Sequence, residues 1–570
     1  MLPYAAPQQD MLFSLLDVAE GERLLDPAKD LDRDTLAALL AEAARLAESE
    51  LAPEVRTSDL NPPKFKDRQV TVGPDMHRAQ QLVSENGWIA MPFAEPLGGL
   101  GLPWSVSTLP MELLNAANVS FSLSVCMTQG CAEAILAHGS QTLIETYVPG
   151  LLSGKYMGTM QLTESGAGSD VGALKTKAEP TDNQTWRLYG TKIFISWGDS
   201  DLTENVVQLV LARTPGAPDG TKGLSLFLVP KRLPDGRRNG VAPSGIENKL
   251  GLHGSPTCTM VHEGSTGWMV GKECGGMAAM FTMMNSARIG VGFQGLGVAE
   301  RALQATRMQA QTRVQGGQAL IHYPDVQRNL MTMKALVAAS RDLGYSALVA
   351  GDLAALGGED APRQKRRIDL LTPIAKAFMS DVAIEVTNLA IQVHGGLGVV
   401  EEAGVAQLAR DCRVFAIYEG TNGIQALDLA GRKTAHDQGR AAFELLDEMA
   451  AWLERVPPDR KDLATPLRAA LEALRDTISW LVAQSTANPK LLAAAASPYL
   501  TAFSHLIAGW HMAKRALLSQ AHIETDPAWA TEQQALTAFY MGQLFPRFHL
   551  ALTAISSCEL SFSDLKAKSI

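Results

Sequence analysis

The sequence predicts a multidomain α+β protein in which a block of strands lies between long helical regions. Three observations predict this class. The 570-residue chain is long enough for three or four domains. Helical periodicity dominates residues 36–156 and 278–570. Short β-branched or aromatic runs, bounded by Gly, Pro, Asp or Asn, fill residues 157–277.

The N-terminal part is predicted to be helical after an extension. Residues 1–35 mix short apolar and acidic pieces, and we interpret them as an N-terminal extension. A helical domain is expected over 36–156, with helices near 106–139 and 140–152. The middle domain, 157–277, is expected to be all-β, with strands at 186–196, 206–212 and 224–229. No helical pattern separates these strands, which argues against a parallel Rossmann sheet.

The C-terminal half is predicted to form two helical domains. Long helical patterns at 278–312, 324–355, 365–394 and 402–433 indicate an antiparallel four-helix domain over 278–435. An additional helical domain follows at 436–570 and contains four Trp residues. An amphipathic membrane-surface element is the alternative for this last domain. We favour a packed bundle, because Lys and Arg are not concentrated there.

Composition excludes several classes of function. The net charge of −10 gives no reason to expect a nucleic-acid partner. The six cysteines are scattered without metal-ligand spacing, which argues against a zinc site or a disulfide framework and favours a reducing compartment. No signal peptide is evident, and no apolar run approaches the ~18 residues of a membrane span. We therefore expect a cytoplasmic protein without stable membrane insertion and without a metal.

One carboxylate draws attention near the end of the four-helix region. Glu419 lies in the run Ile417-Tyr418-Glu419-Gly420-Thr421, with no basic residue within five positions. Taken alone, an ordinary surface Glu is the simpler interpretation. A carboxylate can act as a general base when desolvation raises its pKa, so a catalytic role becomes attractive if other site segments accompany it.

Three glycine-containing segments could form other parts of such a site. The turn Leu162-Thr163-Glu164-Ser165-Gly166-Ala167-Gly168-Ser169-Asp170 offers hydroxyls and accessible backbone amides, but no Gly-Lys-Ser/Thr makes it a P-loop. The segment 194–198 ends a predicted strand with Phe194, Ser196 and Gly198. The segment Gln392-Val393-His394-Gly395-Gly396 ends a predicted helix. Because no strand precedes it, we do not interpret it as a dinucleotide fingerprint; a helix C-cap explains at least one of its glycines.

Together these segments resemble the acyl-CoA dehydrogenase family over about residues 40–435, in the family's order and spacing. The additional C-terminal domain is similar to that of the enlarged subgroup that includes 3-methylmercaptopropionyl-CoA dehydrogenase-like enzymes. The resemblance implies a helical N-terminal domain, an antiparallel β-barrel-like middle domain, a four-helix domain, and FAD bound where the last two meet. The implied FAD contacts are Met160, Leu162, Thr163, Ser169, Phe194, Ser196, Arg313, Gln392, Gly395, Gly396, Thr421 and Gly423.

The resemblance also implies the reaction. Glu419 matches the base that removes the α-proton of an acyl-CoA thioester, while FAD N5 takes the β-hydride to give the trans-2-enoyl-CoA. The implied substrate contacts are Ser169, Asn285, Arg288, Glu419 and Gly420. Electrons would pass to an electron-transfer flavoprotein, and the protein would be a homo-oligomer, with a dimer favoured over a tetramer.

Two departures and two alternatives accompany this resemblance. Ser165 replaces the family's usual Pro in the turn, and the usual Arg-x-x-Phe-Gly is shortened at Arg313. An acyl-CoA oxidase that reduces O₂ is an alternative on the same fold. A DNA-associated flavoprotein is another, but the acidic chain and the retained Glu419 disfavour it. The acyl chain length remains open.

Overall fold

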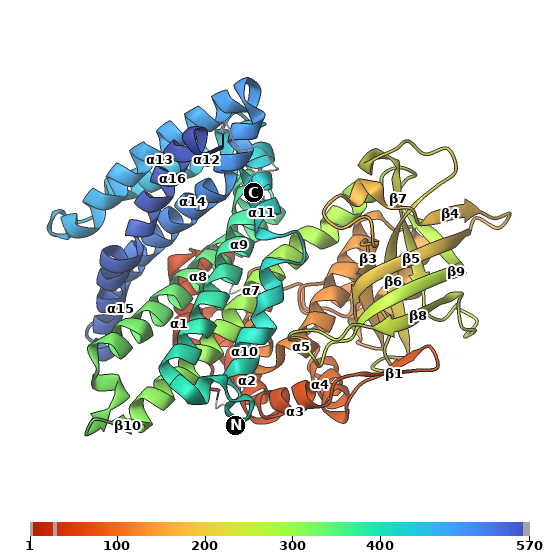
Figure 1. Ribbon diagram of the computed structural model, residues 1–570, viewed down its shortest axis with the longest axis horizontal. Coiled ribbons are helices and arrows are strands. Elements are labelled where there is room, and N and C mark those ends of the chain that lie inside the picture. Colours follow the sequence, from red (N-terminus) through yellow and green to blue (C-terminus); the bar gives the residue numbers. More distant parts are fainter. Residues whose placement is uncertain (1–3, 27–30, 563–570) are drawn as a thin grey trace. The chain divides into compact units, whose positions relative to one another are not determined.

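The computed structural model describes residues 4–26 and 31–562, and their contacts divide them into two compact units. The first unit holds residues 43–103 and 110–290, and the second holds the other described residues. Figure 1 labels the elements along the chain, which mix helices and sheet as the predicted α+β class requires.

The first unit contains a helical part ahead of the sheet. Its helices are α3 (Val55–Leu60), α4 (Pro74–Glu85), most of α5 (Trp104–His138) and α6 (Gln141–Leu152). A hairpin joins β1 (Lys64–Lys66) to β2 (Gln69–Thr71). The helices predicted at 106–139 and 140–152 are therefore confirmed as α5 and α6.

Seven strands form the main sheet of this unit. They are β3 (Tyr156–Gln161), β4 (Lys177–Pro180), β5 (Trp186–Ser196), β6 (Asn205–Arg213), β7 (Leu224–Pro230), β8 (Val241–Ile246) and β9 (Thr257–Val270). The three strands predicted from sequence are confirmed as β5, β6 and β7. Pairing runs β6-β4-β5-β9-β7 and returns to β6, so these five strands close a ring. β3 lies beyond β6, and β8 pairs with β9.

The sheet is mixed, which corrects the prediction of an antiparallel one. β3 pairs with β6 in parallel over its full length, and β4 makes one parallel contact with β6. A parallel pair needs a long crossover connection. Here the crossover from β3 to β6 contains strands β4 and β5 and a short 3-10 helix (Val171–Ala173), but no α-helix. The absence of helical patterns in 157–277 therefore did not exclude parallel pairing.

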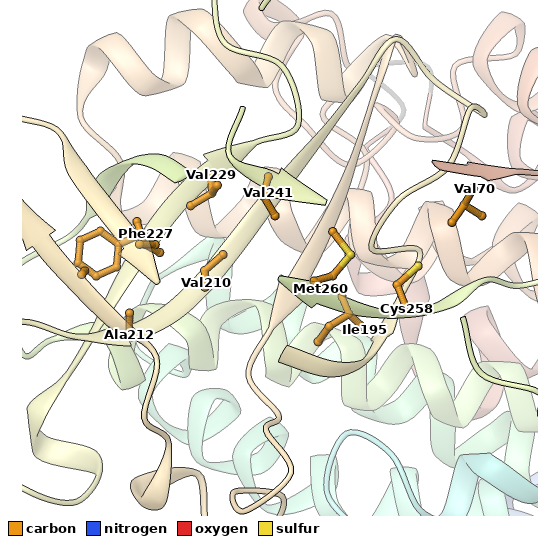
Figure 2. Packing of buried hydrophobic residues seen from close by; sticks show 11 residues of the cluster. Val70, Ile195, Val210, Ala212, Phe227, Val229, Val241, Cys258 and Met260 are labelled. Carbon is orange, nitrogen blue, oxygen red and sulfur yellow. The ribbon is translucent and has the colours of Figure 1, made fainter. Parts of the chain in front are cut away.

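The core of this unit is a cluster of buried apolar side chains from the strands (Figure 2). Leu188, Phe227 and Val210 are fully buried within it. Trp186 packs against Phe227, with ring centroids 5.3 Å apart. Leu188 and Ile195 of β5 belong to this cluster, whereas Phe194 near the end of the strand is exposed and Ser196 is half-buried.

The second unit is helical. Helix α7 (Gly276–Thr312) begins in the first unit and ends in this one. A short hairpin of β10 (Val314–Gln315) and β11 (Gln318–Ala319) follows. The long helices α8 (Pro324–Leu356) and α9 (Ala361–His394) then confirm the patterns at 324–355 and 365–394.

The fourth predicted helix, 402–433, is interrupted. The structure has α10 (Val405–Cys412), a 3-10 turn (Arg413–Ala416), a non-helical segment, α11 (Asn422–Leu427) and a π-helix (Asp428–Ala435). The break contains Glu419 and Gly420 with φ of 55° and 85°. An α-helix cannot include such residues, because its φ is near −63°. The interruption lies at the predicted catalytic residue.

The C-terminal helices pack with the N-terminal segment. They are α12 (Arg440–Leu453), α13 (Lys461–Ala487), α14 (Pro489–Leu518), α15 (Pro527–Phe539) and α16 (Pro546–Phe562). The N-terminal segment contains α1 (Gln8–Leu12) and a π-helix (Phe13–Val18), and α2 (Arg33–Leu46) follows. Buried Arg515 of α14 donates to Ser14 Oγ and to Asp342 Oδ1, both at 2.6 Å. Residues that are distant in sequence thus share one buried polar network.

Two helical stretches, 104–138 and 489–522, are long and apolar enough to cross a membrane by length and composition. Their most apolar windows are 83% and 72% buried inside the protein. Core helices of globular proteins have this composition, so we assign both stretches to the core. Trp510 of α14 is also buried and packs edge-on against Trp452.

Candidate active site

Glu419 lies in the break between α10 and α11, in a left-handed backbone conformation. Its φ is 55°, which is uncommon for a residue with a side chain and favours Asn, Asp or Gly. Gly420 follows with φ of 85°. The conformation favours glycine, and a Cβ here would lie 2.8 Å from Nε2 at the end of the Gln425 side chain, which would have to shift. Glu419 itself is half-buried.

Buried polar side chains hold this loop in place. Lys376, from the middle of α9, has no exposed surface, and its Nζ donates to the Gly420 carbonyl at 2.9 Å and to Asn422 Oδ1 at 3.0 Å. Gln425 Nε2 donates to the carbonyls of Glu419 and Gly420 at 3.1 and 3.2 Å. We call Lys376, Asn422 and Gln425 the Lys376 brace. It holds the two consecutive carbonyls of Glu419 and Gly420.

Neighbouring residues extend this support. Asn422 Nδ2 donates to Asp381 Oδ1 at 2.7 Å and to Ser380 Oγ at 3.0 Å, both on α9. Tyr418 donates to Gln294 Oε1 on α7. The Thr421 hydroxyl caps α11 by accepting from the Ile424 amide at 3.2 Å. Thr421, predicted as an FAD contact, therefore has a structural task as well.

The glycine-rich turn of the first unit follows β3 directly. Leu162 and Thr163 are half-buried, whereas Gly166, Gly168 and Ser169 are exposed. Nothing lies within 4 Å of a Cβ built on Gly166 or Gly168, so the turn presents an open backbone surface. Such a surface fits a ligand that accepts hydrogen bonds from backbone amides.

The end of β5 lies beside this turn. The Ile193 amide donates to the Thr163 carbonyl at 2.9 Å, which joins the two predicted flavin segments. Pairing with β9 is irregular between Lys192 and Ile195, and Phe194 takes φ of 58° with 60% of its surface exposed. An exposed aromatic ring beside hydroxyls and open amides fits a planar heteroaromatic cofactor, and these residues are compatible with FAD.

A buried ion pair lies under the turn. Lys192 Nζ, with no exposed surface, donates to Glu164 Oε1 at 2.9 Å and to the Leu162 carbonyl at 3.0 Å. Burial lowers the pKa of Lys192 to about 8, against the opposing effect of Glu164. Burial alone would raise the pKa of Glu164, but Lys192 and the hydrogen bonds from Thr176 and Lys175 lower it overall. Both groups are therefore charged at neutral pH.

The other predicted residues divide between the two units. In the first, Met160 is buried in β3, Ser196 follows Phe194 in β5, and Asn285 is exposed on α7. Arg288 is 4% exposed, and its guanidinium lies 5.9 Å from the Phe281 ring centroid. The predicted FAD contacts of the second unit are exposed and lie at or near the ends of helices. They are Arg313, Gln392, Gly395, Gly396 and Gly423. The structure thus brings Leu162, Thr163, Phe194 and Ser196 together, and separately Glu419, Gly420 and Thr421.

Sequence reasoning missed the buried lysines. Glu419 has no basic neighbour in sequence, yet Lys376 reaches the next residue's carbonyl from another helix. Lys192 lies within the predicted strand 186–196, and the strand pattern does not distinguish it from its neighbours. A lysine inside an otherwise apolar segment is the signal that could have marked both, because lysine is almost never fully buried without a partner.

Comparison with known families covers most of the chain. The acyl-CoA dehydrogenase N-terminal domain matches residues 33–155, the middle domain 159–264 and the C-terminal domain 275–434. A fourth model, described as acetyl-CoA dehydrogenase C-terminal like, matches 445–566. The chain belongs to the acyl-CoA dehydrogenase family. This dehydrogenase is therefore an enzyme, and its cofactor is the FAD that the family uses.

Individual relatives agree with this assignment. The dehydrogenase is 36% identical to 3-methylmercaptopropionyl-CoA dehydrogenase of Ruegeria pomeroyi, over 92% of each chain. Caenorhabditis elegans ACDH-11, solved in complex with C11-CoA, has a TM-score of 0.83 at 22% identity and covers 99% of this chain and 96% of its own. A Bacillus anthracis acyl-CoA dehydrogenase complexed with FAD has a TM-score of 0.77 at 21% identity, with 92% and 88% covered. The two structures show that the fold is shared along nearly the whole chain.

Proposed function

We propose that this dehydrogenase oxidises an acyl-CoA thioester to the trans-2-enoyl-CoA, with Glu419 as the base that removes the α-proton. The observation that carries the proposal is the conformation of Glu419. Left-handed backbone at a glutamate is unfavourable, and such strain concentrates at functional sites. Here two buried side chains, Lys376 and Gln425, donate to the carbonyls of Glu419 and Gly420. A surface glutamate without a task would not need this support.

The chemistry explains why the carboxylate must be placed by its backbone. The α-proton becomes acidic only when hydrogen bonds stabilise negative charge on the thioester oxygen. We propose that the Glu419 amide supplies one such bond, so that base and oxyanion donor share a residue. Gly420 leaves the space that this arrangement requires. An apolar acyl chain that displaces water would strengthen the carboxylate as a base.

FAD, when bound, supplies the hydride acceptor for the β-carbon. We propose that Met160, Leu162, Thr163, Ser169, Phe194 and Ser196 hold it in the first unit. In the second unit we assign Arg313, Gln392, Gly395, Gly396, Thr421 and Gly423. Asn285, Arg288, Ser169 and Gly420 are proposed to contact the CoA thioester. The open turn and the exposed Phe194 support the first group.

Family membership supports the remaining proposals. We propose an electron-transfer flavoprotein as electron acceptor, a cytoplasmic location, a role in fatty acid β-oxidation, and a homodimer. The names of two relatives suggest a range of acyl chain lengths: one is named for 3-methylmercaptopropionyl-CoA, and another was solved with C11-CoA. We propose a straight-chain acyl-CoA within or near this range as substrate.

The test is anaerobic bleaching of the flavin by a panel of acyl-CoA esters, including 3-methylmercaptopropionyl-CoA. Glu419→Gln should retain FAD, but its flavin should bleach at least ~10²-fold more slowly, because only the proton acceptor is removed. Glu402→Gln, which changes an exposed glutamate just before α10, is the control and should bleach normally. Normal bleaching of Glu419→Gln would exclude Glu419 as the base.

A further inference from the structure

One buried side chain joins the two segments of the first unit that are proposed to contact the flavin. Lys192 lies in β5, two residues before Phe194, and its Nζ donates to the Leu162 carbonyl at 3.0 Å. The next residue, Ile193, donates its amide to the Thr163 carbonyl at 2.9 Å. Consecutive residues of β5 thus hold the consecutive carbonyls of Leu162 and Thr163. The relative position of the turn and the strand end depends on these two bonds.

Glu164 anchors the other end of this connection. Its Oε1 accepts from Lys192 Nζ at 2.9 Å, from the Thr176 amide at 3.0 Å and from the Thr176 hydroxyl at 2.6 Å. Its Oε2 accepts from the Lys175 amide at 2.7 Å. The carboxylate is therefore saturated with donors and cannot rotate without losing several bonds. We call Lys192, Glu164 and Thr176 the Lys192 brace.

A neutral polar layer lies beneath the brace. His262 Nε2 of β9 donates to Gln161 Oε1 at 2.9 Å, and its Nδ1 accepts from Ser265 Oγ at 2.7 Å. Burial, with the charge of Lys192 adding to it, lowers the pKa of His262 to about 3. The histidine is uncharged at neutral pH, so it does not compete with Lys192 for Glu164. The Lys192 cation is consequently directed at Glu164 and the Leu162 carbonyl.

We propose that Lys192 is a positioning residue for the flavin site, which, paired with Glu164, fixes Leu162 and Thr163 against the Phe194–Ser196 end of β5. Lys192 does not need to touch FAD for this role. The backbone atoms that it holds belong to the residues that would contact the flavin ring. The proposal rests on the flavin contacts proposed above, and it is independent of Glu419.

The experiment measures FAD release from the holoenzyme by the fluorescence of freed flavin, and the visible circular dichroism of bound flavin. Lys192→Met should raise the FAD dissociation constant at least ten-fold and change the dichroism spectrum, because the turn loses its connection to β5. The double variant Lys192→Met/Glu164→Gln should recover part of the affinity, since it no longer leaves a buried carboxylate without its cation. Glu164→Gln keeps the side-chain shape and should lower the FAD affinity by a smaller factor. It serves as the test if Lys192→Met does not fold.

Asn239→Ala is the matched control within the same sheet. Asn239 is buried, donates to the Pro230 and Thr266 carbonyls at 2.9 Å, and accepts from the Gly240 and Thr266 amides at 2.8 Å. Its loss should lower the melting temperature without changing FAD affinity or dichroism. Unchanged FAD affinity in both Lys192→Met and Glu164→Gln would overturn the proposal. An equal loss of affinity in Asn239→Ala would overturn it too, because general weakening of the sheet would then suffice. Failure of the Glu419 assignment would appear instead as normal bleaching by Glu419→Gln with FAD retained.

Discussion

Replacing Lys376 with Met tests whether the conformation of Glu419 depends on a buried cation. The change keeps much of the side-chain volume but removes the donors to the Gly420 carbonyl and Asn422 Oδ1. A hydrogen bond to a charged group contributes about 1.5–3 kcal/mol net. Both acceptors keep a second donor, since Gln425 reaches the Gly420 carbonyl at 3.2 Å and Ser380 reaches Asn422 Oδ1 at 3.3 Å.

Because each acceptor keeps a partner, the loss should lie near the value for one bond and not for two. We therefore expect about 1.5–3 kcal/mol less stabilisation of the Glu419–Gly420 conformation. If this loss acts on the position of the base, flavin reduction slows by roughly 10- to 100-fold, since about 1.4 kcal/mol corresponds to a factor of ten. FAD should remain bound, because Lys376 is not among the residues proposed to hold it.

The assay is rapid mixing of the oxidised holoenzyme with a saturating acyl-CoA under anaerobic conditions, together with urea unfolding. Lys365→Met is the control on the same helix, because Lys365 is exposed and pairs only at the surface with Asp369, at 3.1 Å. A surface pair of this kind contributes little to stability. Equal rates of flavin reduction in the Lys376 and Lys365 variants would refute the reasoning that the cation sets the geometry of the loop.

Two further predictions concern the loop and the fold. Gly420→Ala places a Cβ 2.8 Å from Gln425 Nε2 at φ of 85°, so flavin reduction should slow at least ~10-fold while FAD is retained; an unchanged rate would show that the loop tolerates the strain. Arg515→Met leaves Asp342 buried without its cation, so urea unfolding should show a loss of about 3–5 kcal/mol, and a loss below ~1 kcal/mol would mean that the network linking Ser14 to α14 is dispensable.

Local patterns were sufficient to predict the regular elements. β5 begins and ends where its β-branched and aromatic residues predict, at Trp186 and Ser196, and α8 and α9 follow the apolar periodicity. The parallel pairing of β3 with β6 was not predictable in this way. Strand composition reports that a segment is extended and half-buried, but it carries no information on the direction of the neighbouring strand.

In the candidate site, too, local motifs could be predicted from the sequence, whereas long-range contacts could not. The Glu419–Gly420 motif and the turn at 162–170 could be found from the sequence, because their residue types are local. Their supports could not, because Lys376 acts on a carbonyl more than forty residues away in the chain, and Lys192 reaches back to the turn from a later strand. Contacts of this kind depend on the packing of α9 and β5, which only the fold determines.

The two halves of the proposed site share one construction. Glu419 and Phe194 both have φ near +55°, a conformation that costs an ordinary residue roughly 1–2 kcal/mol. A fully buried lysine lies near each: Lys376 donates to the carbonyl of Gly420, the residue after Glu419, whereas Lys192, two residues before Phe194, donates to the Leu162 carbonyl of the neighbouring turn. A buried cation that donates to backbone carbonyls contributes more than this strain costs, provided that its remaining hydrogens are also paired. Lys376 therefore stabilises the loop in which Glu419 takes this conformation, and Lys192 stabilises the connection between the glycine-rich turn and the strand end that carries Phe194.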